Sequence, residues 1–337
     1  MSTTFFAALT PMLMLFTCIA IGYILRKTNI LPHTAAQTLA KLTTWVFMPA
    51  LNFGAMSSRF TVSSISAHGA NIILSTVCVF ICLIIAKLLA RIFIREDNYE
   101  RCVYEYALTF GNSGYVGDPM ALALFGAGGL AFYKVACIPI MILIYTWGAN
   151  VLVPKEQKRS NSLIKNILNA PMVSIFIGAL VGISGLGEFL YSAPRLEFIV
   201  STVNTLSSCM GPAAMILAGI TIASYDFGKM IKNKKVYIAT ALRLIVLPII
   251  ILGMIYGLKE LSNLLLGTNI DNTILFLLFF AIAAPLGLNT VVFPEAYGGD
   301  PSTGASMAMI SHTLCVITIP LMYALLTLVF GPAPIFN

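Results

Sequence analysis

Long apolar runs, separated by short polar segments, are the feature that most restricts what this chain can fold into. A helix needs about 20 mainly apolar residues to cross a bilayer. Ten stretches meet that length: 5–25, 34–56, 69–91, 102–126, 129–152, 170–187, 196–224, 236–258, 273–298 and 302–330. Only 10% of the residues are charged, whereas an average soluble domain has roughly 25%. These features exclude a water-soluble enzyme, a nucleic-acid module and a disordered chain, and they predict an all-α integral membrane protein with ten transmembrane helices.

Basic residues are unevenly divided between the two sets of predicted loops. If both termini lie outside, fifteen of the 20 lysines and arginines fall on the cytoplasmic side and three fall outside. Cytoplasmic loops of membrane proteins carry such an excess. We therefore predict a multi-pass protein of the cytoplasmic membrane with both termini outside. The formal charge of +7 then favours anionic lipid as a partner over nucleic acid.

The two halves of the chain carry helix breakers in the same order. Prolines recur in the second and seventh predicted helices and again in the fifth and tenth, and the fourth and ninth are interrupted by Gly, Asn and Pro. Matching positions are about 163 to 181 residues apart. A duplicated unit of five spans is inserted upside down. We therefore expect an inverted repeat of residues 1–153 and 170–337, joined by a cytoplasmic loop at 154–169.

The interrupted fourth and ninth helices carry the chemistry. Backbone groups freed inside a bilayer must be satisfied by protein or water, so paired breaks indicate a substrate site near the midplane. The N-terminus of each half-helix suits a carboxylate, and an asparagine amide can add a donor. The residues predicted to bind substrate are Asn112, Asn289, Asn52, Gly111, Ser113 and Thr290, and the breaks are assigned to Pro119, Pro285 and Pro294. Alternatively, the asparagines of the breaks only cap the broken helices.

Five ionisable residues within the predicted spans are further candidates, because charge in a bilayer is costly and usually functional. Glu105 and Arg243 are expected to form a structural ion pair, or else to act in proton or substrate binding. Asp118 is placed to cap a half-helix, to bind a cation or to titrate. Lys134 is predicted to pair with Asp118 or to neutralise carbonyl ends at the break, and His312 to hold the equivalent place in the second half.

The sequence shows no pattern typical of a metal site, a nucleotide site or an intramembrane catalytic dyad. Its seven cysteines lie in or beside apolar runs without ligand spacing, and the phosphate-binding Gly-x-x-x-x-Gly-Lys-Ser/Thr loop is absent from the sequence. We therefore expect no metal, no cofactor and no enzymatic activity.

The motifs at the breaks resemble those of the auxin efflux carrier family, which includes plant PIN carriers and bacterial malate or malonate permeases. The most specific segments are GNSGYVGDP at 111–119 and APLGLNTVVFPEAYGGDP at 284–301, followed by SHTL and TIP in the tenth span. The resemblance runs over the whole chain. It implies a fold similar to bile-acid symporters and sodium/proton antiporters, with crossed broken helices 4 and 9. Helices 1, 2, 6 and 7 would form a scaffold, and helices 3–5 and 8–10 a transport domain that moves like an elevator.

In PIN carriers an asparagine from each crossing helix contacts the substrate carboxylate, and Asn112 and Asn289 match those positions. The central loop is short here, which favours a prokaryotic permease over a plant-type carrier. The resemblance implies a secondary transporter of small organic anions such as malate, malonate or auxin-like acids, linked to protons. A sodium-coupled symporter of the bile-acid type and a membrane receptor on the same fold are the alternatives. The expected partners are the anion, protons or sodium, membrane lipid and, as an open possibility, a second copy of the chain.

Overall fold

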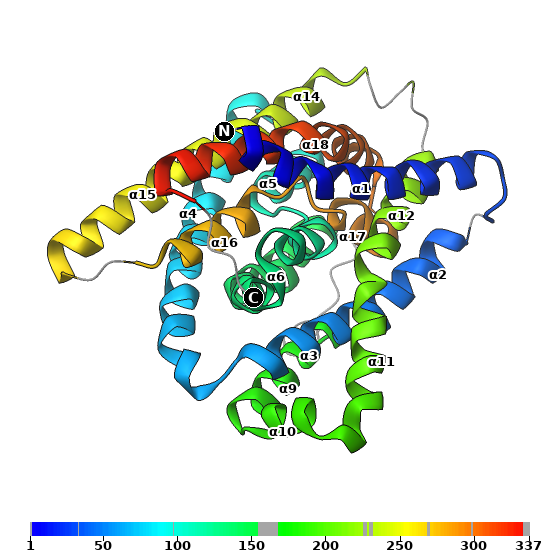
Figure 1. Ribbon diagram of the computed structural model, residues 1–337. Helices are drawn as coiled ribbons and strands as arrows, with labels where there is room; N and C mark the ends of the chain where they lie inside the picture. Colours follow the sequence, from blue (N-terminus) through cyan, green and yellow to red (C-terminus); the bar gives the residue numbers. More distant parts are fainter. Residues whose placement is uncertain are drawn as a thin grey trace.

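The computed structural model describes residues 2–32, 34–96, 98–153, 168–224, 228, 232–267, 270–297 and 299–332. This part of the chain is built from helices (Figure 1), and its isolated bridge between extended residues joins Gly111 to Leu286. The predicted all-α class is therefore confirmed.

Helices of the first half alternate between long segments and segments interrupted by a turn or a break. Their bounds are α1 Ser2–Lys27, α2 Ala35–Leu42, η1 Thr43–Phe47, α3 Met48–Arg59, η2 Val62–Ser64, α4 Ile65–Phe93, α5 Tyr99–Thr109, η3 Ser113–Gly117, α6 Asp118–Leu143, η4 Ile144–Gly148 and α7 Ala149–Leu152.

The second half is also helical. Its bounds are α9 Ala170–Ile183, α10 Leu186–Ser192, η6 Pro194–Leu196, α11 Glu197–Ser208, α12 Met210–Ala223, α14 Lys234–Ala241, η7 Leu242–Val246, α15 Leu247–Leu266, α16 Asn272–Ala283, α17 Asn289–Tyr297 and α18 Ser302–Phe330.

Several helices are long and apolar enough to cross a bilayer. Within the described ranges five continuous helical runs qualify, and a sixth is added if α9 and α10, bent by 87°, count as one span. One of the five covers 40 residues, Ser113–Leu152. It is kinked at Gly126, whose φ of 70° and ψ of −174° belong to a region that is essentially restricted to glycine. The chain is thus a multi-pass helical membrane protein, while the count of ten spans and the inverted repeat stay predictions.

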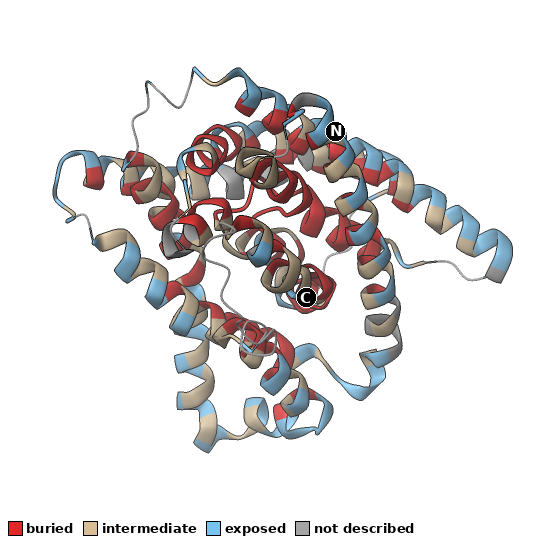
Figure 2. Ribbon diagram, turned by 180° about the vertical axis from the view of Figure 1, so that it is seen from behind, coloured by how far each residue is buried: buried red, intermediate tan, exposed pale blue. Residues whose placement is uncertain are grey.

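The outer helices turn apolar side chains outward, as expected of a protein solvated by lipid. Figure 2 shows buried residues in the middle of the bundle and exposed residues along its outer helices. On α4 the exposed residues recur every three or four positions: Ile73, Val77, Phe80, Ile84, Leu88 and Ile92. The opposite face of α4 carries small buried residues: Cys78, Cys82, Ala86 and Ala90. Such a stripe, wide and apolar on the outside, fits hydrocarbon rather than water.

Among the described residues, three of the four π-helical turns are followed closely by a proline. The turns η1, η3 and η7 are followed at the second residue of the next helix by Pro49, Pro119 and Pro248. Proline has no N–H and crowds the carbonyl four residues earlier. A wider turn upstream accommodates this loss without ending the helix, so these prolines shape helices that continue through them.

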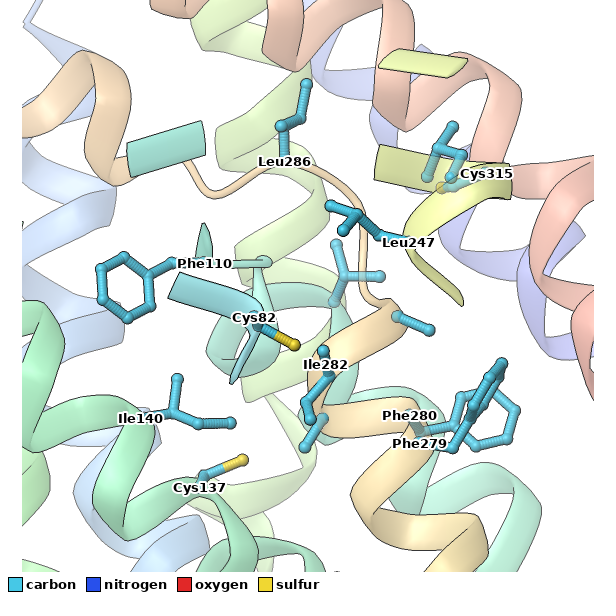
Figure 3. Close-up of a cluster of buried hydrophobic side chains, with 14 of the residues drawn as sticks. Cys82, Phe110, Cys137, Ile140, Leu247, Phe279, Phe280, Ile282, Leu286 and Cys315 are labelled. Carbon is cyan, nitrogen blue, oxygen red and sulfur yellow. The ribbon is translucent and has the colours of Figure 1, made fainter. Parts of the chain in front are cut away.

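The buried core lies where the two interrupted segments meet the helices around them. The helices predicted to form the transport domain pack on one another: α6 contacts both α4 and α16, and α18 contacts α14 (Figure 1). Among the helices predicted to form the scaffold, α3 contacts both α9 and α11, and α1 contacts α12. Figure 3 shows Phe110 and Leu286, from the two breaks, in one buried cluster with Cys82 and Leu247. Helix α1 also contacts α18, and α3 contacts α6. The division into scaffold and transport domain stays a prediction.

Candidate functional site

The two helix breaks, separated by about 175 residues of sequence, lie against each other. Gly111 and Leu286 form an antiparallel bridge, and the backbone N–H of Asn112 donates to the carbonyl of Pro285 at 2.6 Å. A side chain at Gly111 would place its Cβ 2.7 Å from the carbonyl oxygen of Ala284. Glycine is therefore required there by close backbone approach. Each break leaves the C-terminus of one half-helix and the N-terminus of the next at this junction.

Arg243 of η7 satisfies the carbonyl ends of both broken helices. Its Nε donates to Ala284 at 3.1 Å and its Nη2 to Ile282, at the end of α16. Its Nη1 donates to Leu108 at 2.9 Å and to Thr109 at 3.4 Å, at the end of α5. The guanidinium is 1% exposed. It thus supplies the donors and the positive charge that two helix C-termini lack.

The structure therefore corrects the predicted pairing of Glu105 with Arg243. Within the described residues the hydrogen-bond partners of Arg243 are backbone carbonyls, while the Glu105 carboxylate lies 3.6 Å from Nε of Arg101, one turn earlier on α5. It also decides between the two alternatives for Lys134. The carbonyl ends are taken by Arg243, and the Lys134 ammonium donates to Oδ2 of Asp118.

A cavity of about 250 Å³ opens on the N-terminal side of the breaks. Its lining comes from both breaks and from the helices around them: Thr44, Met48, Gly111, Asn112, Ser113, Gly114, Tyr115, Asp118, Lys134, Cys137, Met141, Ile144, Tyr145, Asn169, Pro171, Gly287, Leu288, Asn289 and Phe293. Sites for drug-sized ligands occupy roughly 300–1,000 Å³, so this volume suits a small solute. The cavity unites four of the predicted binding residues, Asn112, Asn289, Gly111 and Ser113, with the predicted pair Asp118 and Lys134.

Asn112 is the best-anchored side chain of the cavity. Its Oδ1 accepts from the N–H of Tyr115 at 3.1 Å, which caps η3. Its Nδ2 lies 3.0 Å from Nε2 of His312, and Nδ1 of His312 lies 2.6 Å from the carbonyl of Ala308. A carbonyl only accepts, so Nδ1 carries the proton and a neutral ring accepts from Asn112 at Nε2. His312 is therefore a partner of Asn112 and not, as expected, the counterpart of Lys134.

Asn289 is held by a residue that sequence reasoning missed. Its Nδ2 donates to the hydroxyl of Tyr106 at 3.1 Å, so a residue of α5 orients the amide of α17. Tyr106 is fully buried and touches the rings of Phe110 and Phe293. Helix α5 carries three tyrosines, and nothing in the sequence separates this role of Tyr106 from packing.

Asp118 and Lys134 form a buried ion pair within α6. Their side chains are 1% and 3% exposed, and they are 16 positions apart in the sequence, on either side of the kink at Gly126. The kink is what brings the beginning and the middle of α6 together. Burial of two charges is tolerated only when they are paired, so each side chain depends on the other.

The remaining predicted site residues lie outside the cavity lining. Asn52 is fully buried and donates to the carbonyl of Pro171 at 2.9 Å and to Oγ of Ser174 at 3.3 Å, so it anchors the start of α9. Thr290 is the second residue of α17, and its hydroxyl donates to the carbonyl of Gly287 at 2.8 Å, just before the helix. The three prolines act through the backbone: Pro285 accepts from Asn112, Pro119 begins α6, and Pro294 lies inside α17.

Comparison with known proteins places the chain in a family. The family model described as membrane transport protein matches residues 7–323. The chain belongs to this membrane transport protein family. The resemblance to auxin efflux carriers noted above is thereby confirmed. The chain is also similar to an uncharacterized transporter of Methanocaldococcus jannaschii, with 24% identity over 312 residues, 92% of this chain and 96% of that protein. It is therefore a multi-pass membrane transport protein.

Proposed function

We propose that the chain is a secondary transporter of small organic anions and that the carboxylate binds at the two helix breaks. The cavity is the observation that supports this most directly. It gathers two amides, Asn112 and Asn289, one ammonium group and the N-terminal ends of η3 and α17. Helix N-termini and neutral donors favour a carboxylate, and the small volume favours substrates of the size of malate, malonate or an aromatic acid.

The walls of the cavity support an elevator-type mechanism. Thr44, Met48 and Pro171 come from the predicted scaffold, and most other lining residues come from the predicted transport domain. The Thr44 and Tyr115 hydroxyls, 3.3 Å apart, join the two walls. A solute held between two such bodies changes sides when one slides past the other. Asn169, at the end of the basic loop, also lines the cavity. With that loop in the cytoplasm and both termini outside, this state is open inward.

Binding and uptake by the purified protein test the proposal. Binding of L-malate, malonate and indole-3-acetate is measured in detergent, and uptake in proteoliposomes with imposed proton or sodium gradients. Asn112→Ala and Asn289→Ala should each lose binding while keeping the wild-type thermal transition within a few degrees. Asn263→Ala, at an exposed position of α15, is the matched control and should bind as the wild type. Wild-type affinity in both cavity variants would refute the assignment. Uptake driven by sodium and not by protons would favour the sodium-coupled alternative.

A further inference from the structure

The buried pair of Asp118 and Lys134 holds one negative and one positive charge at the wall of the cavity. Both side chains line it, together with Asn112. In the described structure the ammonium of Lys134 is committed to the carboxylate of Asp118. The empty cavity therefore contains no uncommitted side-chain cation among its described lining residues.

A substrate carboxylate that enters this cavity must share the ammonium with Asp118. Two carboxylates beside one ammonium leave an excess negative charge at a buried pair, and such sites respond by protonating one of the two acids. The substrate carboxylate has further donors in the amide of Asn112 and in the N-terminus of η3. Asp118, by contrast, has the Lys134 ammonium as its side-chain partner. Protonation therefore falls on Asp118.

We infer that Asp118 takes up one proton when a singly charged carboxylate binds, and that the carboxylate replaces Asp118 as the partner of Lys134. This rests on the function proposed above and adds its coupling. The proton comes from water and adds to the carboxylate of Asp118, which becomes a neutral acid. Lys134 keeps its three protons and its charge. The pair is neutral before the step, and after it the charge of Lys134 is balanced by the bound anion, so the loaded site crosses the membrane without a net charge.

The same count sets the class of substrate. Protonation of Asp118 frees the single ammonium of Lys134, and this one positive charge balances one negative charge on the substrate. A monocarboxylate, or a dicarboxylate that carries one proton, fits this balance, whereas a doubly charged dicarboxylate leaves one charge unbalanced. Affinity for a dicarboxylate should therefore follow the concentration of its singly charged form.

Other titratable groups near the pair are uncharged at neutral pH. On α6 these groups are Tyr133 and Cys137, whose interactions with the pair are electrostatic. The elements packed against α6 add Tyr115 of η3, Tyr145 of η4, Cys78 and Cys82 of α4, and Cys18 and Tyr23 of α1. Helix α4 also carries His68, whose side chain lies outside the described residues. Helices α12 and α16 have no titratable side chain, and α3 has only the exposed Arg59. The remaining charges on α1 and α4 are Arg26, Lys27, Lys87 and Arg91. Phenols and thiols ordinarily titrate above about pH 8. His312, which contacts Asn112, is the competing proton acceptor.

Calorimetry with indole-3-acetate, which carries one charge near neutral pH, counts the protons. Binding heats are measured in two buffers of different ionisation enthalpy. The wild type should take up about one proton per anion, and its Kd should weaken about tenfold per pH unit where Asp118 is ionised in the empty protein. Asp118→Asn should still bind, with no proton uptake and a Kd that no longer changes with pH. Asp300→Asn, an exposed carboxylate outside the cavity, should keep the wild-type count.

Lys134→Gln should weaken binding at least 100-fold, but it leaves Asp118 buried without a partner and its fold is at risk. The double variant Asp118→Asn/Lys134→Gln removes both charges and should fold yet bind as weakly. Proton uptake that persists in Asp118→Asn, or that is lost in His312→Gln instead, would overturn the inference. A wild type that binds the anion without a proton would also overturn it, while leaving the proposed function intact. A wild type that binds none of L-malate, malonate and indole-3-acetate would refute the proposed function and this inference together.

Discussion

Arg243 is the residue whose loss should cost the fold most, because it satisfies both broken helices at once. Arg243→Met keeps an apolar stem of similar length and removes every donor. Its hydrogen bonds to Ala284, Leu108 and Ile282 then disappear, and each buried carbonyl left unpaired costs about 1–3 kcal/mol. Relaxation around the shorter side chain recovers part of this. We therefore expect a loss of about 4 kcal/mol in the free energy of unfolding.

A thermal unfolding assay in detergent should register this loss as a fall in Tm. At about 2 °C per kcal/mol for a chain of this size, the expected shift is about 8 °C. Arg195→Met makes the same change at an exposed position and should leave Tm within about 1 °C. Arg243→Lys keeps the charge without the fork of donors and should fall between the two. An Arg243→Met protein that melts within about 2 °C of the wild type would show that the carbonyls find other donors, and would refute the reasoning.

Three further predictions concern separate parts of the molecule. Gly126→Ala forces a side chain into a conformation that costs about 1–3 kcal/mol, and should lower Tm and transport, whereas Gly253→Ala in α15 should not. Cys137 lines the cavity, so its alkylation by N-ethylmaleimide should abolish substrate binding. Bound malonate should slow this alkylation, and equal alkylation rates with and without malonate would contradict the assigned site. Asn52→Ala should cost about 1–3 kcal/mol of stability through its lost bonds to α9 with an unchanged Kd, and a weakened Kd at unchanged Tm would return Asn52 to the binding site.

The parts of the site that could be predicted from sequence are those in which a backbone constraint leaves a mark. Gly111, Asn112 and Pro119 interrupt an apolar run, and a similar interruption recurs around Asn289. The two breaks, which meet at the bridge from Gly111 to Leu286, could therefore be located from the sequence. Asp118 and Lys134 stand out because charge is rare in a span. The fold class also follows from the sequence, because a long apolar span in a bilayer must satisfy its own backbone hydrogen bonds and therefore forms a helix.

Contacts made by backbone carbonyls could not be predicted in this way. The sequence suggests Glu105 as the partner of Arg243 because charged side chains can be read from it. The helix ends whose carbonyls bind the guanidinium cannot be read in the same way. Asn52 faces α9 and not the cavity because helix rotation is set by packing, which a single sequence does not specify. Tyr106 and His312 act through hydrogen bonds between distant segments, so only the folded structure brings them to the asparagines.

The carbonyl cap on the first broken helix has a consequence for biosynthesis. Arg243 and Leu108 are 135 residues apart in the chain. At roughly 5–20 residues per second, the ribosome needs roughly 7–27 s after making α5 before the arginine that closes its end exists. During that interval the end of α5 has no partner from its own chain, and exposed carbonyls are not tolerated in hydrocarbon. The end of α5 therefore waits for η7, held meanwhile by water or by the insertion machinery, and the junction of the two breaks is completed only late in synthesis.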